Sequence, residues 1–199
     1  MLSLAAWGLL VVASVACSPA PPTAEQTFDA LVVGSPTPLS LADNGFLDNI
    51  DQAQQDFAGE LGTFWDGYNG FVSEGAAGDS TERERFLDDS EDVISRVDAE
   101  LERLEIDLFL TESQDLRNTF APYLGLWRTV HDSLIQVRDG VEDDDAGAQQ
   151  DGADFYAQQI AAVAQADFDR VAQAVEQLDP DTAREFLEAE GLNPQDFGL

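Results

Sequence analysis

The sequence predicts an all-α fold, an up-down-up-down four-helix bundle with short C-terminal helices. Four segments of roughly 27 to 30 residues repeat apolar side chains at steps of three and four, which places those side chains on one face of a helix. The four lengths match and the connections are short or modest, as this kind of bundle requires. No run of alternating β-branched residues indicates a sheet.

A short apolar run precedes the bundle. No charged residue occurs before Glu25, and residues 4–17 are almost entirely apolar. The run is short for a membrane-spanning helix, which needs about 20 apolar residues, and its length suits the apolar region of a secretory signal. It ends at Ser14-Val15-Ala16-Cys17, which resembles the lipobox of bacterial lipoprotein signal peptides.

Cys17 is the expected point of lipid attachment. The resemblance implies that residues 1–16 are a signal peptide and that the thiol of Cys17 carries a diacylglyceryl group. Two features differ from the usual pattern, because Ser14 stands where an aliphatic residue is common and the first three residues contain no Lys or Arg. The alternatives are an ordinary secretory signal and a retained anchor. Cys17 is the only cysteine in the chain, which favours the lipoprotein interpretation.

Residues 17–44 are interpreted as the lipid-attachment cysteine and a Pro-rich tether. Five of the eight prolines lie here: Pro19, Pro21, Pro22, Pro36 and Pro38. Proline excludes a continuous helix or a central strand and favours an extended spacer. The predicted organisation is therefore a signal peptide at 1–16, the tether at 17–44, and an acidic helical-bundle domain at 45–199.

The first predicted helix begins at Phe46. Its apolar stripe consists of Phe46, Ile50, Ala53, Phe57, Leu61, Phe64, Tyr68 and Phe71. Four glycines fall in its second half: Gly59, Gly62, Gly67 and Gly70. Each costs about 1 kcal/mol relative to alanine, which predicts a kinked or frayed second half. Residues 73–80 form the loop that follows.

The second and third helices each begin with a capping-box pattern, at residues 81–84 (TERE) and 111–114 (TESQ). The stripe of the second helix consists of Phe86, Ser90, Val93, Val97, Leu101, Leu104 and Leu108. The stripe of the third consists of Leu116, Phe120, Tyr123, Trp127, Val130, Leu134 and Val137. Pro122 lies inside the third helix and predicts a kink near Asn118.

An acidic, glycine-containing loop is predicted at residues 139–152, before the fourth helix. The stripe of that helix consists of Ala153, Tyr156, Ile160, Ala164, Phe168, Val171, Val175 and Leu178. Asp179-Pro180 then begins a short fifth helix that ends at Gly191, and Asn193-Pro194 begins a final turn that ends near Phe197. These C-terminal pieces are expected to cover one end of the bundle.

The charge is strongly one-sided: 40 acidic residues stand against nine basic ones, all arginine, for a net charge of −31. Nucleic acid and anionic lipid headgroups are excluded as partners, because both need a basic surface. Most arginines have an acid three or four residues away, as in Asp92 with Arg96, which predicts ion pairs along single helices. Arg117 has none at these spacings and is expected to reach another helix.

Few residues in the sequence suit a metal or a catalytic site. The only histidine, His131, follows Arg128 rather than a Glu at the i−3 position, so the di-metal pattern of helical bundles is absent and a hydrogen-bonding role at the rim is favoured. No metal site is predicted, and the densest acidic cluster offers only weak candidates: Glu142, Asp143, Asp144 and Asp145. This cluster does not match a calcium loop, because alanine fills two ligand positions.

Aromatic side chains on or beside the stripes are predicted to be core residues. They are Trp65, Tyr68, Tyr123, Trp127 and Tyr156. If the bundle held an apolar ligand, these residues and the glycines at 59, 62 and 67 mark where room would exist. No nucleophile elbow and no phosphate-binding glycine loop occurs, and no cofactor is predicted.

Together these features predict a lipid-anchored protein of the cell envelope with a non-catalytic binding or scaffolding role. It would be exported and held at the cell membrane or outer membrane, with the domain facing the periplasm or the exterior. Its expected partners are the membrane, through the lipid anchor, and an envelope protein, but no nucleic acid. The alternative is a ligand- or cation-binding accessory lipoprotein, and an enzyme with carboxylate chemistry ranks third.

The acidic residues are spread over the outer faces of the predicted helices, so the charge is a property of the whole surface. Repulsion of this size destabilises a compact fold unless salt screens it. A saline habitat is therefore predicted, with an acid-rich genome as the alternative.

The melting temperature should rise between about 0.1 and 2 M NaCl, as measured by circular dichroism. An unchanged or falling melting temperature would contradict the saline interpretation.

Overall fold

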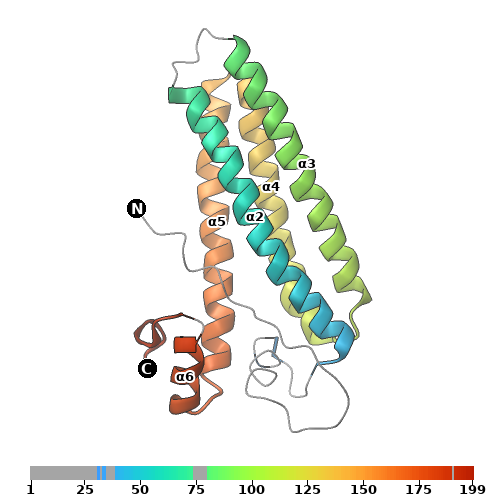
Figure 1. The fold of residues 1–199 in the computed structure, drawn as a ribbon, viewed down its shortest axis with the longest axis vertical. Coiled ribbons are helices and arrows are strands. Elements are labelled where there is room, and N and C mark those ends of the chain that lie inside the picture. Colours follow the sequence, from blue (N-terminus) through green and yellow to red (C-terminus); the bar gives the residue numbers. More distant parts are fainter. Residues whose placement is uncertain (1–30, 32, 35–38, 74–79, 190) are drawn as a thin grey trace. The chain divides into compact units, whose positions relative to one another are not determined.

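The computed structural model describes residues 31, 33–34, 39–73, 80–189 and 191–199, all of whose regular elements are helical. The elements are α2 (Leu41–Ser73), α3 (Ser80–Leu110), α4 (Gln114–Glu142), α5 (Ala146–Val175), α6 (Pro180–Ala189) and the 3-10 helix η1 (Pro194–Phe197) (Figure 1). The predicted all-α helical bundle is confirmed. The predicted signal peptide at 1–16 and Cys17 lie outside the described residues.

The chain divides into two compact units. The first unit takes the residues up to 55, 107–121 and 165–199, and the second takes 56–106 and 122–164. Each unit therefore contains part of all four long helices. Contacts and sites are described below within one unit at a time.

In the second unit the four long helices alternate in direction. Along each helix pair, residue numbers rise on one helix as they fall on the other, as they must in antiparallel packing. Phe64–Phe86 and Glu60–Arg96 show it for α2 and α3, and Arg128–Glu105 and Arg83–Val141 show it for α3 and α4. Thr129–Gln159 and Gly140–Gln149 show it for α4 and α5, and Trp65–Tyr156 and Tyr68–Gln149 show it for α2 and α5. The up-down-up-down order follows from these contacts.

Three of the four predicted stripes are buried. Every stripe residue of α3 and α4 is buried, as is every one of α2 except Tyr68 and Phe71, which are half-buried. Burying a side chain of this size stabilises the fold by about 1.5–3 kcal/mol relative to leaving it in water. This burial is the main force that holds the helices together.

The stripe predicted for α5 is wrong in part. Val175 is buried, but Phe168 is 41% exposed, and Val163, which lies outside the predicted stripe, is fully buried. Successive steps of four residues rotate by about 40° each around a helix, so residues 156–168 drift away from the inner face. Polar residues lie near that face instead: the side chain of Gln159 lies 3.0 Å from the Thr129 hydroxyl.

The predicted loop at residues 139–152 is also wrong, because most of it is helical. Helix α4 continues to Glu142 and α5 begins at Ala146, so only residues 143–145 connect them. A Cβ atom on Gly140 would lie 2.7 Å from the backbone nitrogen of Gln149, and one on Gly152 would lie 2.9 Å from that of Val137. These two glycines therefore allow close packing of α4 against α5.

The glycines of α2 have a different environment. A Cβ atom on Gly59, Gly62 or Gly70 would meet nothing within 4 Å, and on Gly67 it would make only an ordinary contact with Phe86. All four are exposed, so they make no room inside the bundle. Helix α2 continues through them to Ser73, and α4 likewise continues through Pro122.

The starts of α2 and α4 also differ from the predicted positions. Helix α2 begins at Leu41, five residues before the predicted Phe46 and inside the segment interpreted as tether. Helix α4 begins at Gln114, where Ser113 accepts a hydrogen bond from the Leu116 amide at 3.2 Å. The cap is therefore Ser113 and not Thr111, whose hydroxyl instead donates to the Leu108 carbonyl at 2.7 Å.

The C-terminal elements begin and end as predicted. Asp179 accepts the Thr182 amide at 3.1 Å, and Asn193 accepts the Gln195 amide at 3.3 Å. Gly191 has a φ of 72°, which suits the end of a helix. Within the first unit, a small core of Ala174, Val175, Ala183 and Leu187 joins α5 to α6, with Phe186, Leu192, Phe197, Leu199 and the N-terminal Leu31 packed around it.

Alanine substitution should separate the two classes of glycine. Gly140→Ala and Gly152→Ala should each lower the free energy of unfolding by about 1–3 kcal/mol, because backbone atoms of the neighbouring helix cannot move aside. Gly59→Ala and Gly62→Ala, the matched controls, should raise it by about 0.5–1 kcal/mol through helix propensity. Urea unfolding of the four variants measures both effects. Equal effects in the two classes would refute the close packing of α4 and α5.

Candidate functional site

The strongest candidate for a site lies in the first unit, where α2 begins and α3 passes into α4. Asp43, in the first turn of α2, is only 3% exposed. Its Oδ1 atom accepts the backbone amides of Glu112 at 3.0 Å and Ser113 at 3.1 Å. These amides precede the first turn of α4, where free N–H groups and the helix dipole favour a negative charge.

Asp43 also completes the cap of its own helix. Its Oδ2 atom accepts the Ser40 hydroxyl at 2.8 Å and the Ser40 amide at 3.2 Å, while its own amide donates to the Ser40 hydroxyl at 3.2 Å. This is a reciprocal capping box. The spacing of Ser40 and Asp43 is a sequence signal for it, but the predicted tether covered both residues.

The pKa of Asp43 reflects two opposing effects. Burial raises the pKa, but hydrogen bonds from Ser113, Ser40 and Glu112 to the carboxylate outweigh burial, and the net shift is downward. The ionised form of Asp43 therefore stabilises the folded state.

Arg117 also binds the segment that connects α3 to α4. Its guanidinium donates to the Thr111 carbonyl, and also to the Glu112 carbonyl at 3.4 Å and the Gln114 side chain at 3.2 Å. The expectation that Arg117 reaches a different helix is therefore wrong. Carbonyl groups at the end of a helix carry partial negative charge, so an arginine can be satisfied there without an acid nearby.

A hollow of about 370 Å³ lies beside this connection. Its polar lining residues include Asp48, Asn49 and Asp107, and Asn49 donates to Asp107 at 3.0 Å. The remaining lining residues are Ala42, Gly45, Phe46, Leu110 and Thr111. The lining of the hollow thus includes two carboxylates, an amide and apolar side chains.

Three large apolar side chains are exposed at the same end of α2 and α3. Leu41 is 89% exposed, Phe109 80% and Leu110 66%; we call these three residues the apolar rim. Leaving such a side chain in water forgoes about 1.5–3 kcal/mol relative to full burial. Contiguous exposed apolar patches mark contact surfaces, and Leu110 of the apolar rim also lines the hollow. The stripe patterns did not include these residues, because they lie off the buried faces.

The four acidic candidates lie at the end of α4 and in the turn before α5. Asp145 caps α5, accepting the amides of Gly147 at 2.9 Å and Ala148 at 3.1 Å. Glu142 lies 3.4 Å from Arg138, and Asp144 has a φ of 57° in the tight turn. All four acids, including Asp143, are exposed. In the part of the chain that the structure describes, no three or more His, Cys, Asp or Glu side chains are grouped to hold a metal ion.

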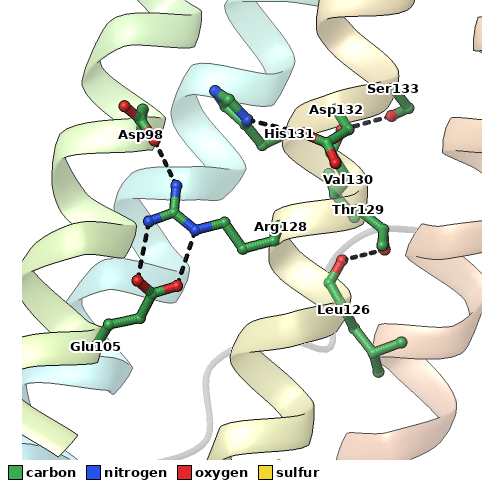
Figure 2. A network of polar contacts seen from close by, with 9 residues as sticks. All are labelled: Asp98, Glu105, Leu126, Arg128, Thr129, Val130, His131, Asp132 and Ser133. Carbon is green, nitrogen blue, oxygen red and sulfur yellow. Dashed lines mark hydrogen bonds and ion pairs between the residues drawn. The ribbon is translucent and has the colours of Figure 1, made fainter. Parts of the chain in front are cut away.

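The polar network around Arg128 joins two helices of the second unit (Figure 2). Arg128 on α4 contacts Glu105 on α3 at 2.8 Å and also bonds Asp98 on α3. The hydrogen bond from Arg128 lowers the pKa of Glu105 and outweighs desolvation and the nearby charge of Asp98, which both raise it. Arg96 likewise pairs with Glu60 on α2 through two contacts of 2.7 Å, not with Asp92 as predicted.

His131 lies next to this network but is buried rather than at the rim. It is 8% exposed, and its Nδ1 atom lies 3.5 Å from the Asp132 carboxylate (Figure 2). The neighbouring Ser133 hydroxyl donates to the Val130 carbonyl. In the described part of the chain, His131 belongs to no group of three or more His, Cys, Asp or Glu side chains that could hold a metal ion.

The aromatic residues are core residues or partly buried neighbours of the core. Trp127 packs on Phe57 with ring centroids 4.7 Å apart, and Trp65 packs on Tyr156 at 4.6 Å. Burial raises the pKa of Tyr156. Tyr123 and Trp127 are buried, which confirms the prediction for them, whereas Trp65, Tyr68 and Tyr156 are half-buried. The described residues offer no hydrogen-bond partner to the buried indole nitrogen of Trp127.

Removing the Asp43 carboxylate should destabilise the fold in a pH-dependent way. Asp43→Ala should lower the free energy of unfolding by about 1–3 kcal/mol, because two amides lose their acceptor. Because the folded pKa lies below the unfolded one, the stabilisation is complete above about pH 4 and disappears as the pH falls through the folded pKa. The stability difference between wild type and Asp43→Asn should therefore shrink in acid, measured by urea unfolding from pH 7 to 3. Asp88→Asn, at an exposed position on α3, is the control and should show no such loss.

Among the described residues, no helix is both long and apolar enough to cross a membrane. The chain matches no protein-family model, and no curated protein or solved structure is significantly similar to it.

Proposed function

We propose that this chain is a lipid-anchored protein of the cell envelope whose helical bundle is a non-catalytic binding or scaffolding module. The observation that carries the proposal is the apolar rim, Leu41, Phe109 and Leu110, exposed beside a hollow in an otherwise acidic surface. A rim of this kind is suited to contact another surface. The lipobox-like residues ending at Cys17 supply the proposed anchor.

The path of the N-terminal segment supports the anchoring role. Val33 is buried, its carbonyl accepts the Thr119 hydroxyl at 3.3 Å, and Leu31 packs against the small core of α5 and α6. The segment that would carry the lipid therefore enters the first unit, which also holds the apolar rim. An anchor at Cys17 would keep this unit near the membrane.

The non-catalytic assignment rests on the composition of the bundle interior. The buried stripes of α2, α3 and α4 carry apolar and small polar side chains. Of the buried ionisable groups, Asp43 accepts backbone amides, Asp51 accepts the Gln55 side chain at 3.2 Å, and His131 lies 3.5 Å from Asp132. The acidic outer surface, with a net charge of −31, is proposed to be an adaptation to a saline exterior.

The second candidate is a ligand- or cation-binding accessory lipoprotein. The hollow favours it, because Asp48 and Asp107 line a space that apolar side chains also line. Calorimetry with Ca²⁺ discriminates the two candidates. Saturable heat at millimolar concentration would favour the accessory role, and its absence would favour the scaffold.

The lipid anchor is tested by Cys17→Ser. The variant should move from the membrane fraction to the soluble fraction after cell lysis, because without the thiol no diacylglyceryl group can be attached. Immunoblotting of the two fractions measures the shift, and mass spectrometry of the wild-type chain detects the lipid. A variant that stays in the membrane fraction to the same extent as wild type would remove the lipoprotein proposal.

The scaffold role is tested by pull-down from detergent-solubilised envelope, which should recover a stoichiometric protein partner.

A further inference from the structure

We propose that the Asn69-Gly70 pair near the end of α2 is a site of self-modification. In the folded chain Asn69 converts, through a succinimide, into an aspartyl or isoaspartyl residue, and this conversion loosens the last turn of α2. The site lies within the second unit. It is independent of the proposed anchoring and binding roles.

Asn69 and Gly70 supply the reacting atoms, and water supplies the rest. The backbone nitrogen of Gly70 gives its proton to a base in the solvent and attacks the side-chain Cγ of Asn69. The new N–Cγ bond closes a succinimide ring, while the side-chain nitrogen takes up a proton and leaves as ammonia. Water then opens either carbonyl of the ring, and nothing is oxidised or reduced. Glycine favours the attack, because it has no Cβ to shield the nitrogen and its backbone rotates readily.

The position of the pair in α2 decides whether the attack can occur. Inside a helix the N–H of each residue is bonded to the carbonyl four residues earlier, so the helix must open before the Gly70 nitrogen can react. Asn69 lies four residues before Ser73, where α2 ends, and helix ends open more readily than helix interiors. Gly67 and Gly70 each cost about 1 kcal/mol relative to alanine in a helix, which makes this end easier to open.

Few tertiary contacts oppose opening at this end. None of residues 69–73 is buried, and Asn69 and Gly70 are both exposed. The half-buried Phe71 stacks on Phe86 with ring centroids 5.8 Å apart, and the Ser73 hydroxyl donates to the Gly70 carbonyl at 3.2 Å in an exposed contact. Opening the helix from Asn69 onward therefore breaks one partly buried ring stack but exposes no core side chain.

The chain contains a natural comparison, the pair Asn44-Gly45 at the start of α2 in the first unit. Both residues are half-buried. They lie between Asp43, whose buried carboxylate accepts two backbone amides of a distant segment, and the buried Phe46 and Leu47. Opening this part of α2 would break the capping contacts and expose core side chains. The same dipeptide is therefore expected to be protected here.

Conversion changes the end of α2 in two ways. A new carboxylate at position 69 lies three residues after the exposed Asp66 and near the C-terminal end of the helix, where like charge and the helix dipole both disfavour it. An isoaspartyl linkage also adds a carbon atom to the backbone, so the regular hydrogen bonds of the helix cannot continue across it. We expect the last turn to stay open and the stack of Phe71 on Phe86 to be lost.

The experiment follows both asparagines in the full chain. The folded protein is incubated in mildly alkaline buffer, and a parallel sample is incubated in urea. Mass spectrometry of proteolytic peptides detects the small mass increase when the side-chain NH2 group is replaced by OH, and chromatography separates the aspartyl and isoaspartyl products. Two variants accompany the wild type. Gly70→Ala hinders the attack at a position where a Cβ atom would meet nothing within 4 Å, and Gly67→Ala strengthens the helix without altering the reacting pair.

In the folded chain, position 69 should convert several-fold faster than position 44, and both products should form. In urea the two positions should convert at similar rates, because the reacting dipeptide is the same. Gly70→Ala should slow conversion at position 69 in both conditions, whereas Gly67→Ala should slow it only in the folded chain. Converted molecules should lose hydrogen-exchange protection in residues 69–73.

Three outcomes would overturn the inference. Conversion at position 69 that is no faster than at position 44 in the folded chain, including no conversion at either, rejects the site. Formation of the aspartyl product alone means direct hydrolysis of the side chain instead of a succinimide. Unchanged hydrogen exchange in the converted molecules rejects the loosening of the last turn of α2.

Discussion

The Asp43 carboxylate joins two parts of the chain that are 69 and 70 residues apart, by accepting the amides of Glu112 and Ser113. At the same time it caps α2 through Ser40. The start of one helix and the approach to another are thus fixed by a single buried charge. The hollow and the apolar rim lie around this contact, so their geometry depends on it. A buried carboxylate is tolerated here because its lone pairs are satisfied by amides that would otherwise be unpaired.

The charge of the chain limits how it can be held together. With nine arginines for 40 acids, most carboxylates cannot be paired and must face water. The arginines that join helices do so with the planar, two-pronged geometry of guanidinium, as Arg96 does with Glu60 and Arg128 does with Glu105. Exposed pairs of this kind contribute little individually. The apolar stripes therefore remain the source of stability, and the arginines mainly relieve repulsion between neighbouring helices.

The sequence alone predicted the features that depend on local periodicity. The stripes of α3 and α4 are buried because steps of three and four residues encode a helix face directly. The stripe of α5 was partly wrong, since Phe168 continues the apparent period but lies outside. The loop at 139–152 was misassigned because Gly140 and Gly152 suggest a turn in sequence, although in the fold they allow two helices to meet.

The candidate site was largely beyond prediction from one sequence. The contact between Asp43 and the start of α4 joins residues too far apart for spacing rules, and so does the pair of Glu60 with Arg96. Whether Leu41 and Phe109 are exposed depends on which other side chains pack over them. This follows from the folded structure and not from the spacing of apolar residues in the sequence. The capping-box spacing of Ser40 and Asp43 was the one local signal available.

The short connection between α4 and α5 has a consequence for how the chain folds. Only residues 143–145 separate the two helices, and Asp145 starts α5 by capping it. Closing so short a loop costs little chain entropy, and the glycine contacts then hold residues that are close in sequence. The contact between Asp43 and Glu112 must instead close a loop of many more residues. The α4–α5 hairpin is therefore expected to form early in folding, and the first turn of α2 to dock late.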